Sequence, residues 1–215
     1  MLGAIFTEMR NKDNNTEEAI LRAAEFEFLE KGFAGAKTVA IADRAGVTHA
    51  MLHYYYRSKR NLYEKILNDK MEMVIKSFVA SFDLPDMDFV QRIKLGMEAH
   101  FDFIKANPLL PRFLINEVFA RNDIGLMQLM RNKMSKVYEK VQREIDAAVG
   151  DGLLRPITAF ELMVDIVSLN LFTFVALPIL SDFSGIFYES EDLMLEARKR
   201  ENVEMIMSRI LINKN

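Results

Sequence analysis

Hydrophobic residues recur along most of this chain at intervals of three and four, the spacing that places them on one face of an α-helix. No alternation of apolar and polar residues lasts long enough to predict a strand. We therefore expect an all-α fold. The pattern predicts two short helices within residues 38–57 and longer ones over residues 16–31, 58–82, 86–106, 111–120, 123–149, 158–180 and 189–212.

The stretch from Thr38 to Leu62 has the residues needed for two short helices joined by a tight turn. Thr38 is expected to cap the first helix, Thr48 the second and Ser58 the helix that follows, because their hydroxyls accept from the free amides of a helix start. Gly46 supplies a left-handed turn at no steric cost. Two helices joined in this way form a helix-turn-helix, whose second helix enters the DNA major groove.

Positive charge gathers in the same stretch, although the chain carries a net charge of −3. A local excess of cations on an acidic chain is what contact with DNA phosphates requires. The alternative is a solvated charge pair at a frayed helix end. Between residues 37 and 62 the acidic residue is Asp43, and the basic residues are Lys37, Arg44, Arg57, Lys59 and Arg60.

The second short helix is expected to read DNA with its first residues, while Leu52 and Tyr56 point inward. A tyrosine hydroxyl, from Tyr54 or Tyr55, should reach a phosphate. His49 and His53 lie one turn apart, which also suits a metal, but no carboxylate or cysteine completes such a site; both then face DNA or solvent, and no metal is expected. The predicted DNA-binding residues are Lys37, Thr38, Thr48, His49, Ala50, Met51, His53, Tyr54, Tyr55 and Lys59.

Residues 16–67 resemble the DNA-binding region of the TetR family of transcriptional regulators. The chain departs from the family at His53, where tyrosine is usual, at Tyr56, where phenylalanine is usual, and at Arg60, where an acid is common. The resemblance implies a three-helix helix-turn-helix domain followed by a helical ligand-binding and dimerisation domain. The matching residues are ILRAAEFEFLEKGF (20–33), Thr38, Ile41-Ala42, Ala45-Gly46-Val47, Leu52, Ser58-Lys59 and Leu62.

We expect three parts in the chain. Residues 1–15 have too short an apolar run for a signal peptide and are expected to form a mobile arm. Residues 16–62 form the DNA-binding domain, and a linking helix that starts within it runs over 58–82. Residues 83–215 form the effector-binding and dimerisation domain, which begins after Pro85 disrupts helical geometry.

The second domain is expected to dimerise and to bind an effector. The run 166–180 is too short to span a membrane, so its apolar sides must be buried by the chain's own core or by a second copy. The resemblance implies a homodimer formed through helices 158–180 and 189–212. Polar side chains within apolar helices either orient an unknown small apolar effector or are satisfied in the core. The candidates are Met97, His100, Phe101, Ile104, Phe113, Asn116, Glu117, Asn170 and Phe174.

These features predict a cytoplasmic, sequence-specific regulator that binds a palindromic double-stranded operator, most simply a repressor released by its effector. The alternative is a TetR-like architectural or cell-division factor that binds DNA without a small-molecule inducer. The sequence holds no phosphate-binding glycine loop, G-x-S-x-G elbow or H-E-x-x-H motif, so no enzyme and no cofactor is expected. The absence of cysteine from its 215 residues excludes disulfides and suits the cytosol.

Overall fold

The computed structural model describes residues 2–84, 87–115 and 124–212. These residues form helices, the turns between them and an isolated antiparallel bridge between Leu154 and Leu211, which confirms the all-α fold class. The chain divides into two compact units, the first from residues 1–72 and 112–122 and the second from 73–111 and 123–215. The domain limits expected from the sequence stay a prediction.

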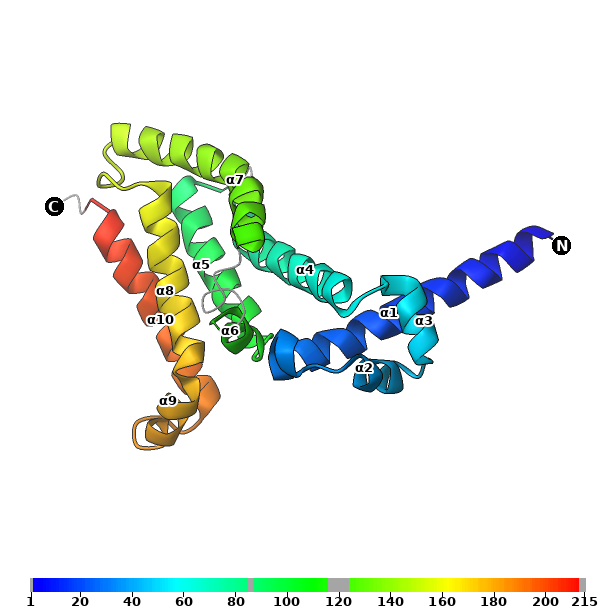
Figure 1. Cartoon of the computed structure of the whole chain (residues 1–215). Coiled ribbons are helices and arrows are strands. Elements are labelled where there is room, and N and C mark those ends of the chain that lie inside the picture. The colour runs from blue at the N-terminus through cyan, green and yellow to red at the C-terminus, as the bar shows by residue number, and fades with distance from the viewer. Residues whose placement is uncertain (1, 85–86, 116–123, 213–215) are drawn as a thin grey trace. The chain divides into compact units, whose positions relative to one another are not determined.

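The first unit is built from the N-terminal helices (Figure 1). Its elements are α1 (Leu2–Gly35), α2 (Thr38–Ala45), α3 (His49–Tyr56) and the first part of α4 (Lys59–Val79). The expectation that the first helix starts at residue 16 is wrong, because α1 already begins at Leu2. The polar run over residues 11–15 contains no proline or glycine to interrupt a helix. Whether the first residues act as an arm stays a prediction.

Charged side chains inside the first unit have partners. Lys70, which falls in the apolar stripe of α4, is buried, and its Nζ lies 2.5 Å from Glu25 Oε1 on α1. Glu27 is also buried and accepts from Lys31 Nζ at 2.7 Å. A buried charge without a partner is costly, so these pairs allow acidic residues within α1. The apolar core around them includes Ile20, Ala23, Ala24, Phe28, Ile41, Ala42, Leu62 and Ile66.

The second unit contains the remaining helices (Figure 1). They are the end of α4, the 3-10 helix η1 (Ala80–Asp83), α5 (Phe89–Lys105), the start of α6 (Leu110–Phe113), α7 (Ile124–Gly150), α8 (Ala159–Val175), α9 (Leu177–Ser184) and α10 (Glu191–Ile210). Side chains cap three of them: Asp88 accepts from Gln91 N, Thr158 from Glu161 N and Ser190 from Leu193 N. The helix predicted over 111–120 runs beyond residue 115 and so partly outside the described residues.

The helix predicted over residues 158–180 is in fact two helices. α8 ends at Val175, and α9 follows from Leu177 with a bend of 63° between them. Pro178 lies in the first turn of α9; it has no amide hydrogen to bond to the preceding turn and its ring clashes there, so a straight helix cannot continue. α9 extends to Ser184, beyond the predicted end of the helix at residue 180.

The core of the second unit consists of two apolar clusters. The larger joins α5, α7, α8 and α10 through residues such as Ile93, Ile145, Ile166 and Ile206. The smaller contains Phe101, Ile104, Phe174, Met194 and Leu195. No single helix in the described residues is long and apolar enough to cross a membrane, although α8 and α9 taken together pass on length and composition.

Candidate nucleic-acid interface

The turn between α2 and α3 is formed as its sequence predicts. Gly46 adopts φ 68° and ψ 28°, the left-handed conformation that costs other residues about 1–2 kcal/mol. Its amide donates to Asp43 O at 3.2 Å, and the Val47 amide donates to Ala42 O at 3.0 Å. These bonds satisfy the last carbonyls of α2 and fix the direction in which α3 departs.

Two of the three predicted helix caps are confirmed. Thr48 Oγ1 accepts from Met51 N at 3.2 Å at the start of α3, and Ser58 Oγ accepts from Asn61 N at 3.1 Å at the start of α4. The third prediction is wrong. The extended residue before α2 is Lys37, which makes no side-chain cap, and Thr38 is already the first residue of the helix.

One side of α3 is anchored in the first unit. Leu52 is 1% exposed and Tyr56 is also buried, as predicted. The Tyr56 hydroxyl donates to Glu17 Oε1 on α1 at 3.2 Å. Burial, followed by the nearby Glu17 carboxylate, raises the pKa of Tyr56 well above its usual value, so the hydroxyl keeps its proton and remains a donor. This contact fixes α3 against α1.

The other side of α3 faces solvent and carries the predicted reading residues. Thr48, His49, Ala50, Met51 and His53 are all exposed. Tyr54 is 79% exposed and its ring lies edge-on to that of the half-buried Tyr55, with centroids 5.5 Å apart. A helix with one side anchored and the other exposed and polar can enter a groove without losing its own packing.

The cations predicted from the sequence lie around this helix, and several rest on aromatic rings. The Arg44 guanidinium lies over the Phe26 ring, 3.9 Å from its centroid. Lys59 Nζ lies 4.7 Å from the centroid of Phe33. Such contacts hold long side chains in place while leaving their charge accessible. Lys37, Arg44, Arg57 and Arg60 are exposed, and Lys59 is half-buried.

The expected effector residues are divided between the two units. Met97, His100, Phe101 and Ile104 on α5 and Asn170 and Phe174 on α8 are buried in the second unit. Phe113 belongs to the first unit, where its ring lies 6.2 Å from that of Tyr63. Asn116 and Glu117 lie outside the described residues.

His100 and Asn170 form a buried polar network with Asn202 of α10, a residue that was not predicted. Asn170 Nδ2 donates to Met97 O at 3.0 Å and to His100 Nδ1 at 3.2 Å, and Asn202 Nδ2 donates to Asn170 Oδ1 at 3.0 Å. An amide nitrogen only donates, so Nδ1 of His100 must accept and the ring is neutral. Burial lowers the pKa of His100 to about 4. Asn202 Oδ1 accepts no hydrogen bond from the described residues.

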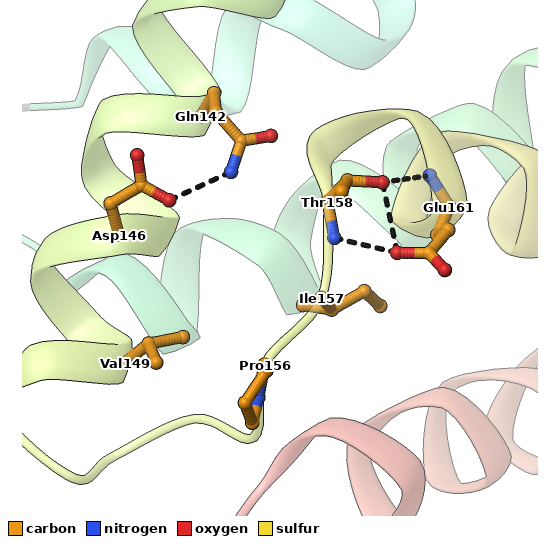
Figure 2. A pocket seen from close by; sticks show the side chains of 7 residues that line it. All are labelled: Gln142, Asp146, Val149, Pro156, Ile157, Thr158 and Glu161. Carbon is orange, nitrogen blue, oxygen red and sulfur yellow. Dashed lines mark hydrogen bonds between the residues drawn. The ribbon is translucent and has the colours of Figure 1, made fainter.

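A pocket lies elsewhere in the second unit, between α7 and the start of α8 (Figure 2). It has a volume of about 390 Å³ and is lined by polar and apolar side chains that were not predicted to bind an effector. Its polar groups largely bond to one another: Gln142 donates to Asp146, and Thr158 and Glu161 form a capping box. The lining residues are Gln142, Asp146, Val149, Pro156, Ile157, Thr158 and Glu161.

These features define a helix-turn-helix DNA-binding protein. They are the left-handed glycine turn, the capped second helix with its exposed polar face, and the cations around it. Residues 20–66 match the sequence model of the family described as bacterial regulatory proteins, tetR family. Residues 20–66 therefore carry a DNA-binding region of the TetR family type.

Similar proteins agree with this family. The nucleoid occlusion factor SlmA of Vibrio cholerae is 29% identical over 139 residues, which are 57% of this chain and 70% of that protein. The transcriptional activator FasR of Mycolicibacterium smegmatis is 32% identical over 94 residues, 44% of this chain but only 42% of that protein. The crystal structure of a TetR family regulator from Marinobacter aquaeolei superposes on this chain with a TM-score of 0.68 and 18% sequence identity. The match covers 94% of this chain and 98% of that protein, so the two share the fold.

Proposed function

We propose that the protein is a homodimeric repressor that binds a palindromic operator through α3 and releases it when a small apolar effector binds the second unit. The observation that carries the proposal is the exposed face of α3 with exposed cations beside it, among them Lys37, Arg44 and Arg57. Cations position a protein on phosphates, and the helix face reads the bases. We place this action in the cytoplasm, where bacterial DNA lies, and expect no catalytic turnover.

Dimer formation is supported by apolar side chains on the exposed face of α8. Phe160, Val164 and Phe172 are separated by multiples of four residues and are all exposed, as are Leu193 and Met205 on α10. Residues so spaced share one helix face, and an apolar stripe in water favours association. Pairing of these helices with a second copy would present two α3 helices to successive major grooves, about 34–36 Å apart.

Effector binding is supported by the polar network within the second unit. No donor among the described residues reaches the buried Asn202 oxygen, and a ligand that brings a donor to it would gain a hydrogen bond. Apolar side chains around His100 and Asn170, such as Phe101 and Phe174, suit the rest of such a ligand. The effector would lower DNA affinity only through its preference for one of two shapes, a coupling of about 1–3 kcal/mol.

Repression is a simpler effect on transcription than activation, because a dimer bound at a promoter blocks polymerase without needing an activating surface. FasR, a similar protein, is a transcriptional activator, so the sign must be tested directly. A promoter that carries the selected operator should drive less reporter expression when this protein is present. Increased expression would contradict the repressor proposal while leaving DNA binding intact.

Replacing Lys59 with Ala should weaken binding to every DNA sequence by a similar factor. Lys59 lies at the start of α4 beside the Phe33 ring, where its ammonium suits a phosphate contact. Loss of one such contact lowers the slope of log affinity against log salt by about 0.9. Fluorescence anisotropy at several salt concentrations measures this slope.

The matched control is Lys65→Ala. Lys65 is exposed on the same helix and paired with Asp69 at 2.8 Å. Its removal should leave the salt slope unchanged. Equal slopes for the Lys59 variant and the wild type would remove Lys59 from the phosphate contacts.

Selection of bound fragments from random duplex DNA tests the proposed function. Purified wild-type protein should enrich a palindromic consensus whose half-site centres lie about one helical turn apart, because a two-fold dimer reads two equal half-sites. A single, non-repeated half-site would contradict the dimer. Failure to enrich any sequence would contradict operator recognition.

A second function is favoured by the similarity to SlmA, a nucleoid occlusion factor. The buried packing of the predicted effector residues also suits a DNA-binding factor that has no inducer. Mapping of bound sites across the bacterial chromosome distinguishes the two. A few sites at promoters would support the repressor, whereas many sites spread along the chromosome and away from promoters would support the architectural function.

A further inference from the structure

A hydrogen bond joins the first residues of the two helices of the helix-turn-helix. Thr38 Oγ1, at the start of α2, lies 3.0 Å from His49 Nε2, at the start of α3. The His49 ring also lies edge-on to the His53 ring, with centroids 5.3 Å apart and planes at 70°. An exposed imidazole at the start of the reading helix therefore contacts both a hydroxyl and a second ring.

This arrangement leaves one ring nitrogen of His49 for recognition. Nε2 is occupied by Thr38, whereas Nδ1 makes no hydrogen bond to the described residues. The Thr38 hydroxyl can donate to Nε2 or accept from it, and in either case the bond fixes the orientation of the ring and so the place of Nδ1. Each base pair presents its own pattern of donors and acceptors in the major groove, so a fixed Nδ1 can distinguish bases.

We propose that Thr38 is a positioning residue that holds His49 in the orientation with which it reads a base. A side chain that is already oriented loses less conformational freedom on binding. Thr38 thus contributes to sequence selectivity through His49 and not through a phosphate contact of its own. This inference rests on the proposed DNA-binding function of α3.

The test uses full-length protein with Thr38→Val, which removes the hydroxyl and keeps the shape, and Thr38→Ser, which keeps the hydroxyl. The base that His49 reads is identified first. It lies at the position of the wild-type consensus where the His49→Ala variant no longer prefers one base over the others. Thr38→Val should reduce that preference by roughly tenfold, a size typical of a single base-pair mismatch. Thr38→Ser should retain it, and Thr38→Val should change nothing further in the His49→Ala background.

A uniform loss of affinity at all positions in Thr38→Val would overturn the proposal, because a phosphate contact carries no sequence information. Additive effects of the two substitutions would also overturn it. Circular dichroism should show that each variant unfolds at the wild-type urea concentration.

A measurement without DNA separates this inference from the proposed function. Nitrogen NMR shifts of the His49 ring should change in Thr38→Val and not in Thr38→Ser, which reports the hydrogen bond in the free protein. Unchanged His49 shifts in Thr38→Val would overturn the positioning role even if DNA binding is intact. Changed shifts in a protein that selects no DNA would instead overturn the function of α3 and leave the contact itself supported.

Discussion

Replacing Leu52 with Ala is expected to lower the free energy of unfolding by about 2–5 kcal/mol, the usual cost of truncating a buried leucine. Leu52 is 1% exposed and lies on the inner side of α3. Its loss removes packing between the reading helix and the rest of the first unit. DNA binding should fall with stability, since an α3 that is not anchored cannot hold its outer face in position. Urea unfolding followed by circular dichroism measures the change.

The adjacent residue provides a matched control. Met51 is 40% exposed on the same helix, so Met51→Ala should change the free energy of unfolding by no more than about 0.5 kcal/mol. A similar cost for both substitutions would mean that α3 is not anchored through Leu52. That result would remove the structural basis for assigning an inner and an outer face to this helix.

His100 should make the second unit less stable as the pH falls from about 6.5 to about 4. Burial lowers the pKa of His100 from 6.5 to about 4 in the folded protein. In this interval the unfolded chain takes up a proton that the folded chain does not. The free energy of unfolding therefore decreases as the pH decreases. Below the pKa of the folded state the loss of unfolding free energy is complete. It amounts to about 3 kcal/mol, because each unit of difference between the two pKa values contributes 1.36 kcal/mol.

The variant His100→Gln should remove this part of the pH dependence. Glutamine does not titrate, and its side-chain oxygen can still accept from Asn170 Nδ2, the donor that His100 Nδ1 now uses. Urea unfolding of both proteins at pH 7 and pH 5 gives the comparison. The wild type should lose more stability than the variant over this range. Equal losses would show that a buried neutral His100 does not contribute to the pH response.

The sequence predicted the local chemistry of the helix-turn-helix well. Gly46, Thr48 and Ser58 act within one turn of themselves, and their residue types determine which conformations and bonds they favour. Thr38 was predicted wrongly by the same rule. A threonine can cap a helix or occupy its first turn, and here the bond to His49, eleven residues away, uses its hydroxyl.

Contacts between distant residues could not be predicted from one sequence. The network of His100, Asn170 and Asn202 brings together three helices, and Phe26 meets Arg44 across two. Periodicity identifies the side of a helix that is buried but not the residue that it meets. Periodicity also does not reveal a bend. The apolar residues before and after Pro178 follow one another as they would in a single long helix, although the chain forms two helices, α8 and α9.

The proposed function depends on the exposed face of α3 being the surface that binds DNA. The most direct test measures the affinity of the selected duplex for the wild type and for the variant with His49, His53 and Tyr54 all replaced by Ala. These side chains are exposed, so the variant should fold normally. A control with Glu139→Ala and Arg143→Ala changes exposed residues of α7 in the second unit. We predict a loss of roughly 100-fold or more for the α3 variant, because each base contact contributes about 1–3 kcal/mol, and no loss for the control. Wild-type affinity in the folded α3 variant would contradict the account.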